Sequence, residues 1–185
     1  MSTRFYFSLL ILLGTISFPA LAQDSVALEA INSTRLEYNL QGMLILGSWA
    51  ILNLVVGILG SFQRKGQVQA FHQMNAYWNV VNLGIAAFGF WQATQAASLN
   101  FWEVLVAQQQ MEKVLLFNAA LDLGYMSIGF LLIERGRRLE KERWIGFGKS
   151  ILLQGAFLLL FDAILYGFHQ QLGIKLLELG IAVFK

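Results

Sequence analysis

The sequence predicts an all-α protein: a four-transmembrane-helix bundle with a cleavable N-terminal signal peptide and a C-terminal interfacial helix. Hydrophobic residues make up 57% of the 185 residues and charged residues only 13%, about half the charged fraction usual in soluble domains. The charges also leave four long gaps, each wide enough for the roughly 20 apolar residues of a spanning helix. The four gaps therefore predict four spans in a membrane domain.

Residues 1–22 have the composition of a secretory signal peptide. A basic start at Arg4 is followed by an apolar run over residues 5–18 and by an Ala-Leu-Ala cleavage motif at residues 20–22. Cleavage after this motif is expected, and the alternative is an uncleaved signal anchor. A cleaved chain keeps its membrane domain in residues 23–169 and has its new N-terminus outside the cytoplasmic membrane.

The predicted spans cover residues 42–61, 75–97, 114–133 and 147–168. Basic residues crowd the connection between the third and fourth spans, where they are candidates for setting topology and for contacting lipid headgroups. They are Arg135, Arg137, Arg138, Lys141, Arg143 and Lys149. Because positive loops face the cytoplasm, both termini are expected on the outer, periplasmic side of a bacterial inner membrane.

The intervals between and around the spans predict the remaining structure. Residues 24–40 are expected to lead helically into the first span, residues 62–74 to form a cytoplasmic loop, and residues 98–113 to form an outer connection. Residues 170–185 are apolar but too short to span, which predicts an amphipathic or interfacial helix at the outer surface.

Polar residues share one face of the predicted spans. In the second span, Asn75, Asn79 and Asn82 follow the spacing i, i+4 and i+7, which puts three amides on the same side of a helix. Asn53 of the first span and Gln154 of the fourth fall at a similar depth, in the half of the bundle nearer the cytoplasm. These five residues predict an inner polar layer.

Asp122 and Asp162 are the only acidic residues inside the predicted spans, and no basic residue lies at their depth. The rise of about 1.5 Å per residue places each roughly 10 to 12 Å below the outer surface, so the two can meet. Such carboxyls usually pair, bind a cation or hold a proton. Desolvation and mutual repulsion predict that at least one is neutral.

A ligand-binding or proton-binding site is one interpretation of these residues, and a hydrogen-bonded contact that only holds helices together is the other. The candidate site comprises Asp122, Asp162, Asn118, Tyr125, Tyr166 and His169.

Other chemistry is excluded by composition and spacing. The chain has no cysteine, which excludes disulfide exchange and thiolate chemistry. His72 and His169 lie at opposite mouths of the bundle, roughly 30 Å apart, and cannot share a haem. No Glu-x-x-His pair or nucleotide-binding motif is present, so we expect no catalytic residue, no metal and no other cofactor. The basic residues cluster in loops between spans, so no nucleic-acid partner is expected.

Short motifs run through the second, third and fourth predicted spans and the connections beside them: Phe71-His72-Gln73-Met74-Asn75, Trp78-Asn79, Asn82, Asn118-Ala119, Leu121-Asp122, Gly124-Tyr125, Ile133-Glu134-Arg135-Gly136, Gly148-Lys149-Ser150, Gln154-Gly155, Phe161-Asp162 and Tyr166. Together they resemble an uncharacterised bacterial family of small four-helix integral membrane proteins, a domain of unknown function. The resemblance covers about residues 35–169. It implies the fold and a bacterial origin, and it implies no activity.

The expected function is that of a scaffold or partner-binding membrane protein whose polar interior specifies helix packing. Its partners would be the lipid bilayer and a membrane protein or a second copy of the chain. The alternative is a small carrier or channel for protons, cations or a small polar solute that uses Asp122 and Asp162. An intramembrane enzyme with this pair as acid and base is a third interpretation, and it requires a cavity around the pair.

Overall fold

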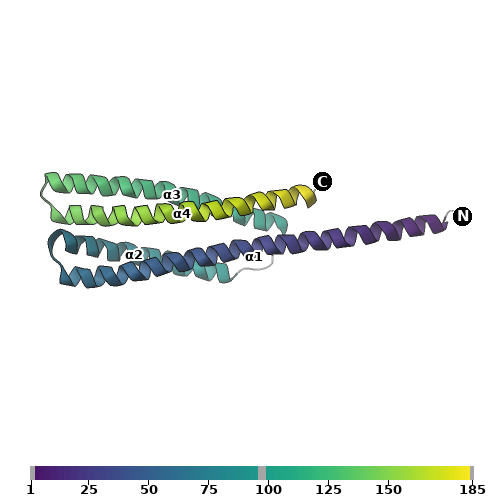
Figure 1. Cartoon of the computed structure of the whole chain (residues 1–185), viewed down its shortest axis with the longest axis horizontal. Coiled ribbons are helices and arrows are strands. Elements are labelled where there is room, and N and C mark those ends of the chain that lie inside the picture. The colour runs from purple at the N-terminus through teal and green to yellow at the C-terminus, as the bar shows by residue number, and fades with distance from the viewer. Residues whose placement is uncertain (1–2, 96–98, 184–185) are drawn as a thin grey trace.

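The computed structural model contains four α-helices that form two helical hairpins (Figure 1). It describes the backbone of residues 3–95 and 99–183, and side chains from Ser25 onward within those ranges. The helices are α1 (Thr3–Gln63), α2 (Gly66–Thr94), α3 (Phe101–Arg138) and α4 (Glu142–Val183). The described residues include no strand, which confirms the predicted all-α fold.

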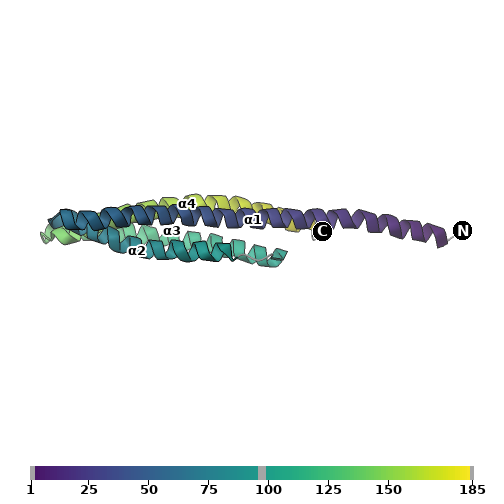
Figure 2. The ribbon, with the colours of Figure 1, turned by 90° about the horizontal axis from the view of Figure 1, so that it is seen from below.

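The two hairpins lie side by side along their whole shared length. The α1–α2 and α3–α4 turns lie at one end of the bundle, here called the turn end, and α4 ends toward the opposite, terminal end (Figure 1). The hairpins meet through α4, which packs against both α1 and α2, whereas α2 and α3 make no direct backbone contact in the described residues. Figure 2 shows α1 and α4 on one side of the bundle and α2 and α3 on the other.

The helices extend beyond the predicted spans and replace most of the predicted loops. The loop expected at residues 62–74 is reduced to residues 64 and 65, because α1 continues to Gln63 and α2 already begins at Gly66, where a φ of 62° suits glycine. Most of the connection expected at residues 98–113 is helix. Asn100 caps α3: its side chain accepts from the Glu103 N–H at 3.0 Å, and the Glu103 carboxylate accepts from the Asn100 N–H at 2.9 Å.

Residues 170–183 do not form the separate helix that was predicted for the C-terminal segment. They continue α4 without a break after His169. Leu172 and Leu176 are buried there, and Gly180 lies against the ring of Phe101 at the start of α3. The large apolar residues Ile174, Leu177 and Ile181 of this stretch are exposed.

Three of the described helices are long and apolar enough to cross a membrane: α1 from Ser25, α3 and α4. Helix α2 is not among them, although it contains no Asp, Glu, Lys or Arg. Its three asparagines lower its hydropathy. The three apolar helices are compatible with a membrane location and with contact to lipid.

Small residues bring the helices of each hairpin into backbone contact. A Cβ atom on Gly148 of α4 would lie 2.5 Å from the carbonyl oxygen of Gly129 on α3. In the other hairpin, a Cβ atom on Gly57 of α1 would lie 2.8 Å from the backbone nitrogen of Ala76 on α2. Such close approach increases van der Waals packing, which is a main source of helix association in membranes.

Candidate functional site

The inner polar layer is a hydrogen-bonded network that joins three helices. The Trp49 indole N–H donates to Gln154 Oε1 at 2.9 Å, and Gln154 Nε2 donates to Asn75 Oδ1 at 2.5 Å. Asn75 Nδ2 in turn donates to Asn53 Oδ1 at 2.9 Å. The structure thus brings together three residues expected in this layer and adds Trp49, which the sequence argument did not include.

Asn79 and Asn82 continue the layer along α2. Asn79 Nδ2 donates to the backbone carbonyl of Asn75 at 2.8 Å, and Asn82 Nδ2 donates to Asn79 Oδ1 at 3.4 Å. All five predicted members are buried. Because buried amides are costly unless they are paired, this mutual pairing identifies the layer as a structural element.

Asp122 of α3 and Asp162 of α4 face each other one level nearer the terminal end. Their carboxyls are close enough to share a hydrogen bond, and the Asn118 side chain is within hydrogen-bonding reach of Asp162. Helical side chains lean toward the N-terminus of their own helix, so side chains on the antiparallel α3 and α4 lean in opposite directions along the bundle. A hydrogen bond between two carboxyls requires a proton on one of them.

Two buried oxygen atoms, one of them within this pair, have no hydrogen-bond partner among the described residues. One is Oδ2 of Asp122, whose residue is 3% exposed, and the other is Oδ1 of Asn39 on α1, whose residue is 8% exposed. Both atoms are hydrogen-bond acceptors. The acidic level therefore differs from the inner polar layer, whose amides are paired with one another.

Both acceptors line a cavity of about 610 Å³ between α2 and α3, here called the α2–α3 groove. Trp78 and Tyr125 contact each other across it, edge to face, with ring centroids 4.9 Å apart. The residues that line the groove include no lysine, arginine or histidine. Its polar floor and apolar walls consist of Asn39, Asn82, Asn118, Asp122, Asp162, Leu46, Trp78, Val81, Ile85, Phe88, Val114, Leu115, Leu121, Tyr125, Leu158 and Phe161, among others.

A model for a family of unknown function, DUF6992, matches residues 45–163 and so covers more than half of the sequence. The chain belongs to DUF6992. The matched range contains the inner polar layer and both aspartates, and it ends before His169. No curated protein and no solved structure matches this DUF6992 chain.

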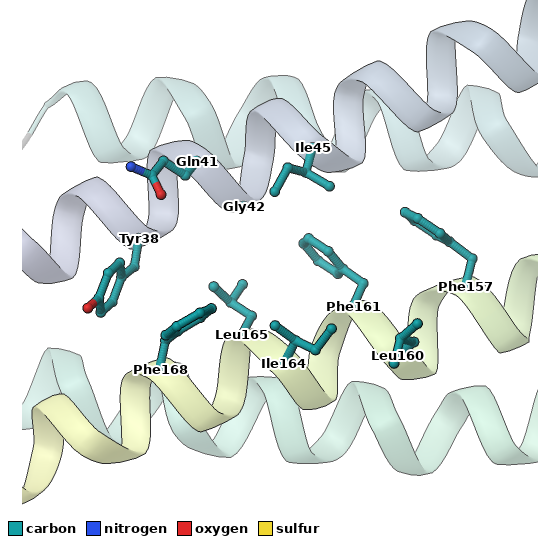
Figure 3. Close-up of a pocket in the computed structure, with 10 residues that line it drawn as sticks. All are labelled: Tyr38, Gln41, Gly42, Ile45, Phe157, Leu160, Phe161, Ile164, Leu165 and Phe168. Atoms are coloured by element: carbon teal, nitrogen blue, oxygen red, sulfur yellow. The ribbon is translucent and has the colours of Figure 1, made fainter.

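The DUF6992 protein has a second groove on the opposite face, between α1 and α4 (Figure 3). This α1–α4 groove has a volume of about 360 Å³ and an almost entirely hydrocarbon lining. Its residues are Tyr38, Gln41, Gly42, Ile45, Phe157, Leu160, Phe161, Ile164, Leu165 and Phe168. Without a charged group it offers little chemical selectivity, which separates it from the α2–α3 groove.

Two residues assigned to the acidic site from the sequence lie elsewhere in the DUF6992 fold. His169 is fully buried, with Nδ1 3.4 Å from Gln108 Oε1 and its ring against Tyr38. It shares a helix face with Asp162, but it lies seven residues further along α4, which puts it about 10 Å further toward the terminal end. Tyr166 does not line the groove either, whereas Asn118 and Tyr125 do.

The predicted basic cluster surrounds the α3–α4 turn of the DUF6992 protein. Arg138 pairs with Glu134 at 2.8 Å on the exposed surface of α3. The charged groups of Arg135 and Lys141 lie 5.9 and 5.2 Å from the ring centre of Trp144. These solvated contacts are typical of a polar helix end, where arginine, lysine and tryptophan meet lipid headgroups.

Asn39 is a polar residue of the α2–α3 groove that was not predicted from the sequence. It precedes the apolar run of the first predicted span, and a count of charges gives it no weight. The available signal was its spacing: Asn39 lies fourteen positions before Asn53, close to four helical turns, and so shares that residue's helix face.

Proposed function

We propose that this protein is a polytopic, partner-binding protein of the bacterial cytoplasmic membrane and that the α2–α3 groove is its binding site. The observation that carries the proposal is the buried Asp122–Asp162 pair, incompletely hydrogen-bonded, at the floor of a groove of about 610 Å³. A pair that served only helix packing would have its oxygen atoms satisfied, as the amides of the inner polar layer are.

The proposal includes four spans, with α2 as the fourth. Its asparagines point into the bundle, while large apolar side chains such as Val80 and Phe88 are exposed on its other faces. A helix with this division presents hydrocarbon to lipid and satisfies its polar groups internally. The basic α3–α4 turn then faces the cytoplasm, and both termini face the periplasm after removal of the signal peptide at residues 1–22.

The direction in which the groove opens supports binding more than transport. Because the backbones of α2 and α3 stay apart, the groove is open along the side of the bundle, where Val81, Ile85 and Leu121 are exposed. A lipid-soluble ligand or an apolar helix could enter there. Toward the turn end, the Trp78–Tyr125 contact and the inner polar layer lie across the route that a transported solute would take.

A carrier of protons or cations is the second candidate, favoured by the proton that the two carboxyls must share to hydrogen-bond. It predicts flux through the purified protein in liposomes, and the loss of that flux when both aspartates are changed to asparagine. If the protein in liposomes binds its partner but shows no flux, the carrier function is contradicted and the partner-binding function is supported.

Filling the groove tests the proposed binding site. We expect the protein purified in mild detergent to carry a membrane-derived partner, visible as added mass in native mass spectrometry. Val81→Trp combined with Ile85→Trp places two bulky rings in the α2–α3 groove, so this variant is expected to lose most of the added mass. The size of the added mass also distinguishes a small amphiphile from a second copy of the chain.

The matched control places the same rings in the other groove. Ile45→Trp combined with Ile164→Trp fills the α1–α4 groove, and the partner is expected to remain bound to this variant. Equal retention of the partner by both double variants would contradict the assignment of the binding site to the α2–α3 groove.

A further inference from the structure

The lining of the α2–α3 groove specifies the chemistry of its ligand. We propose that the groove binds an amphiphile with a protonated amine headgroup and a hydrocarbon chain, and that the ammonium group lies at the Asp122–Asp162 pair. This inference rests on the proposed function, in which the groove is a binding site.

The unpartnered atoms of the groove call for a hydrogen-bond donor. Asp122 Oδ2 and Asn39 Oδ1 are the buried side-chain atoms without a partner among the described residues that line the groove, and both are acceptors. Asp122 is on α3 and Asn39 is on α1, so the two unpartnered atoms are independent observations. A carboxylate or phosphate ligand would leave both unsatisfied, whereas the N–H groups of an ammonium can donate to Asp122. Asn39 remains available to a second donor on the headgroup.

The charge of the site favours a ligand with one positive charge. Two carboxyls that share one proton carry one negative charge, and no lysine, arginine or histidine lines the groove to balance it. One ammonium group makes the site neutral, which removes most of the penalty for a buried charge. A zwitterionic phospholipid headgroup fits less well, because its phosphate would find no cation.

The walls of the groove suit the rest of such a molecule. Apolar side chains from all four helices line it, and its volume of about 610 Å³ is within the range of roughly 300–1,000 Å³ usual for small-molecule sites. Trp78 and Tyr125 add aromatic rings to the lining of the same groove, and such rings attract ammonium groups. The open side between α2 and α3 gives a hydrocarbon chain direct access from the bilayer.

Four probes with the same dodecyl chain separate the contributions of charge and donor. Dodecylamine has a charge and N–H donors, dodecyltrimethylammonium has the charge alone, dodecanol has a neutral donor, and dodecanoate has the opposite charge. Titrated against the full-length protein and followed by native mass spectrometry, dodecylamine is expected to bind about tenfold or more tightly than the other three, a difference of about 1.4 kcal/mol or more.

Variants then locate the headgroup. Asp122→Asn combined with Asp162→Asn keeps the shape of both side chains and is expected to raise the Kd for dodecylamine at least about tenfold. Glu178→Gln removes one acidic group from the exposed surface of α4 and is expected to leave the Kd unchanged. Circular dichroism tests whether the variants remain folded. The comparison of the four probes uses the unaltered protein, so it does not depend on the folding of the variants.

The outcomes separate this inference from the proposed function. If all four probes bind equally and the tryptophans at Val81 and Ile85 block them, the groove is a binding site but its preference for an amine is wrong. If none of the probes binds and the purified protein carries no partner, the proposed function fails as well. Tight binding of dodecylamine that survives the double aspartate change overturns the assignment of the ammonium to the pair.

Discussion

Replacing Gly148 with alanine is expected to lower the free energy of unfolding by about 1–3 kcal/mol, the usual range for an overpacked contact. The added Cβ atom would lie 2.5 Å from the carbonyl oxygen of Gly129 and 2.8 Å from Cγ1 of Ile133. A backbone oxygen cannot rotate out of the way, so α3 and α4 must separate. Gly148→Leu is expected to have a larger effect. Unfolding of the purified protein by a denaturing detergent, followed by circular dichroism, measures the loss.

Gly167→Ala in the same helix is the matched control. A Cβ atom there meets nothing within 4 Å, so the variant is expected to be neutral or stabilised by up to about 1 kcal/mol, because alanine favours the helix. Equal stability of the Gly148→Ala and Gly167→Ala variants would show that the close contact between α3 and α4 is absent.

Replacing Gln154 with leucine is expected to destabilise the protein by about 1–3 kcal/mol, because it leaves buried hydrogen-bonding groups on two other helices without a partner. The Trp49 indole N–H loses its acceptor, and Asn75 Oδ1 loses its donor. The same unfolding measurement reports the effect. Gln171→Leu, at an exposed position of α4, is expected to change stability by less than about 0.5 kcal/mol.

A double-mutant cycle gives the sharper test of the network. The combined change of Gln154 and Asn75 to leucine removes both partners of one bond, so it is expected to destabilise the protein less than the two single changes added together. Residues in one hydrogen-bond network typically differ from additivity by about 0.5–3 kcal/mol. Additive single effects would contradict the hydrogen-bonded contact between α2 and α4.

Features that depend on a single helix could be predicted from the sequence. The spacing of Asn75, Asn79 and Asn82 is enough to put three amides on one face, and the face is buried. The meeting of Asp122 and Asp162 follows from counting residues along two antiparallel helices. The predicted helices were too short, because the bilayer thickness limits a span but not the whole helix. Outside its span, α4 continues where it packs on its neighbours, and α3 begins early, at the cap formed by Asn100.

Features that depend on how the hairpins dock could not be predicted in the same way. The α2–α3 groove exists because α4 packs against both α1 and α2 and leaves the backbone of α3 apart from α2, and no local pattern encodes that arrangement. For the same reason, Asn39 could not be assigned to the acidic level, and His169 was assigned there by its helix face alone. Depth along a helix and contact across helices are separate quantities, and the sequence specifies the first more directly.

The division of the bundle into two hairpins has a consequence for how the protein is made. The α1–α2 hairpin is synthesised first, with Asn53 and Asn75 already able to bond to each other. Gln154 arrives only with the second hairpin and completes the network by joining both to Trp49. The Trp49 indole N–H and Asn75 Oδ1 of the first hairpin therefore lack these partners until the second hairpin docks.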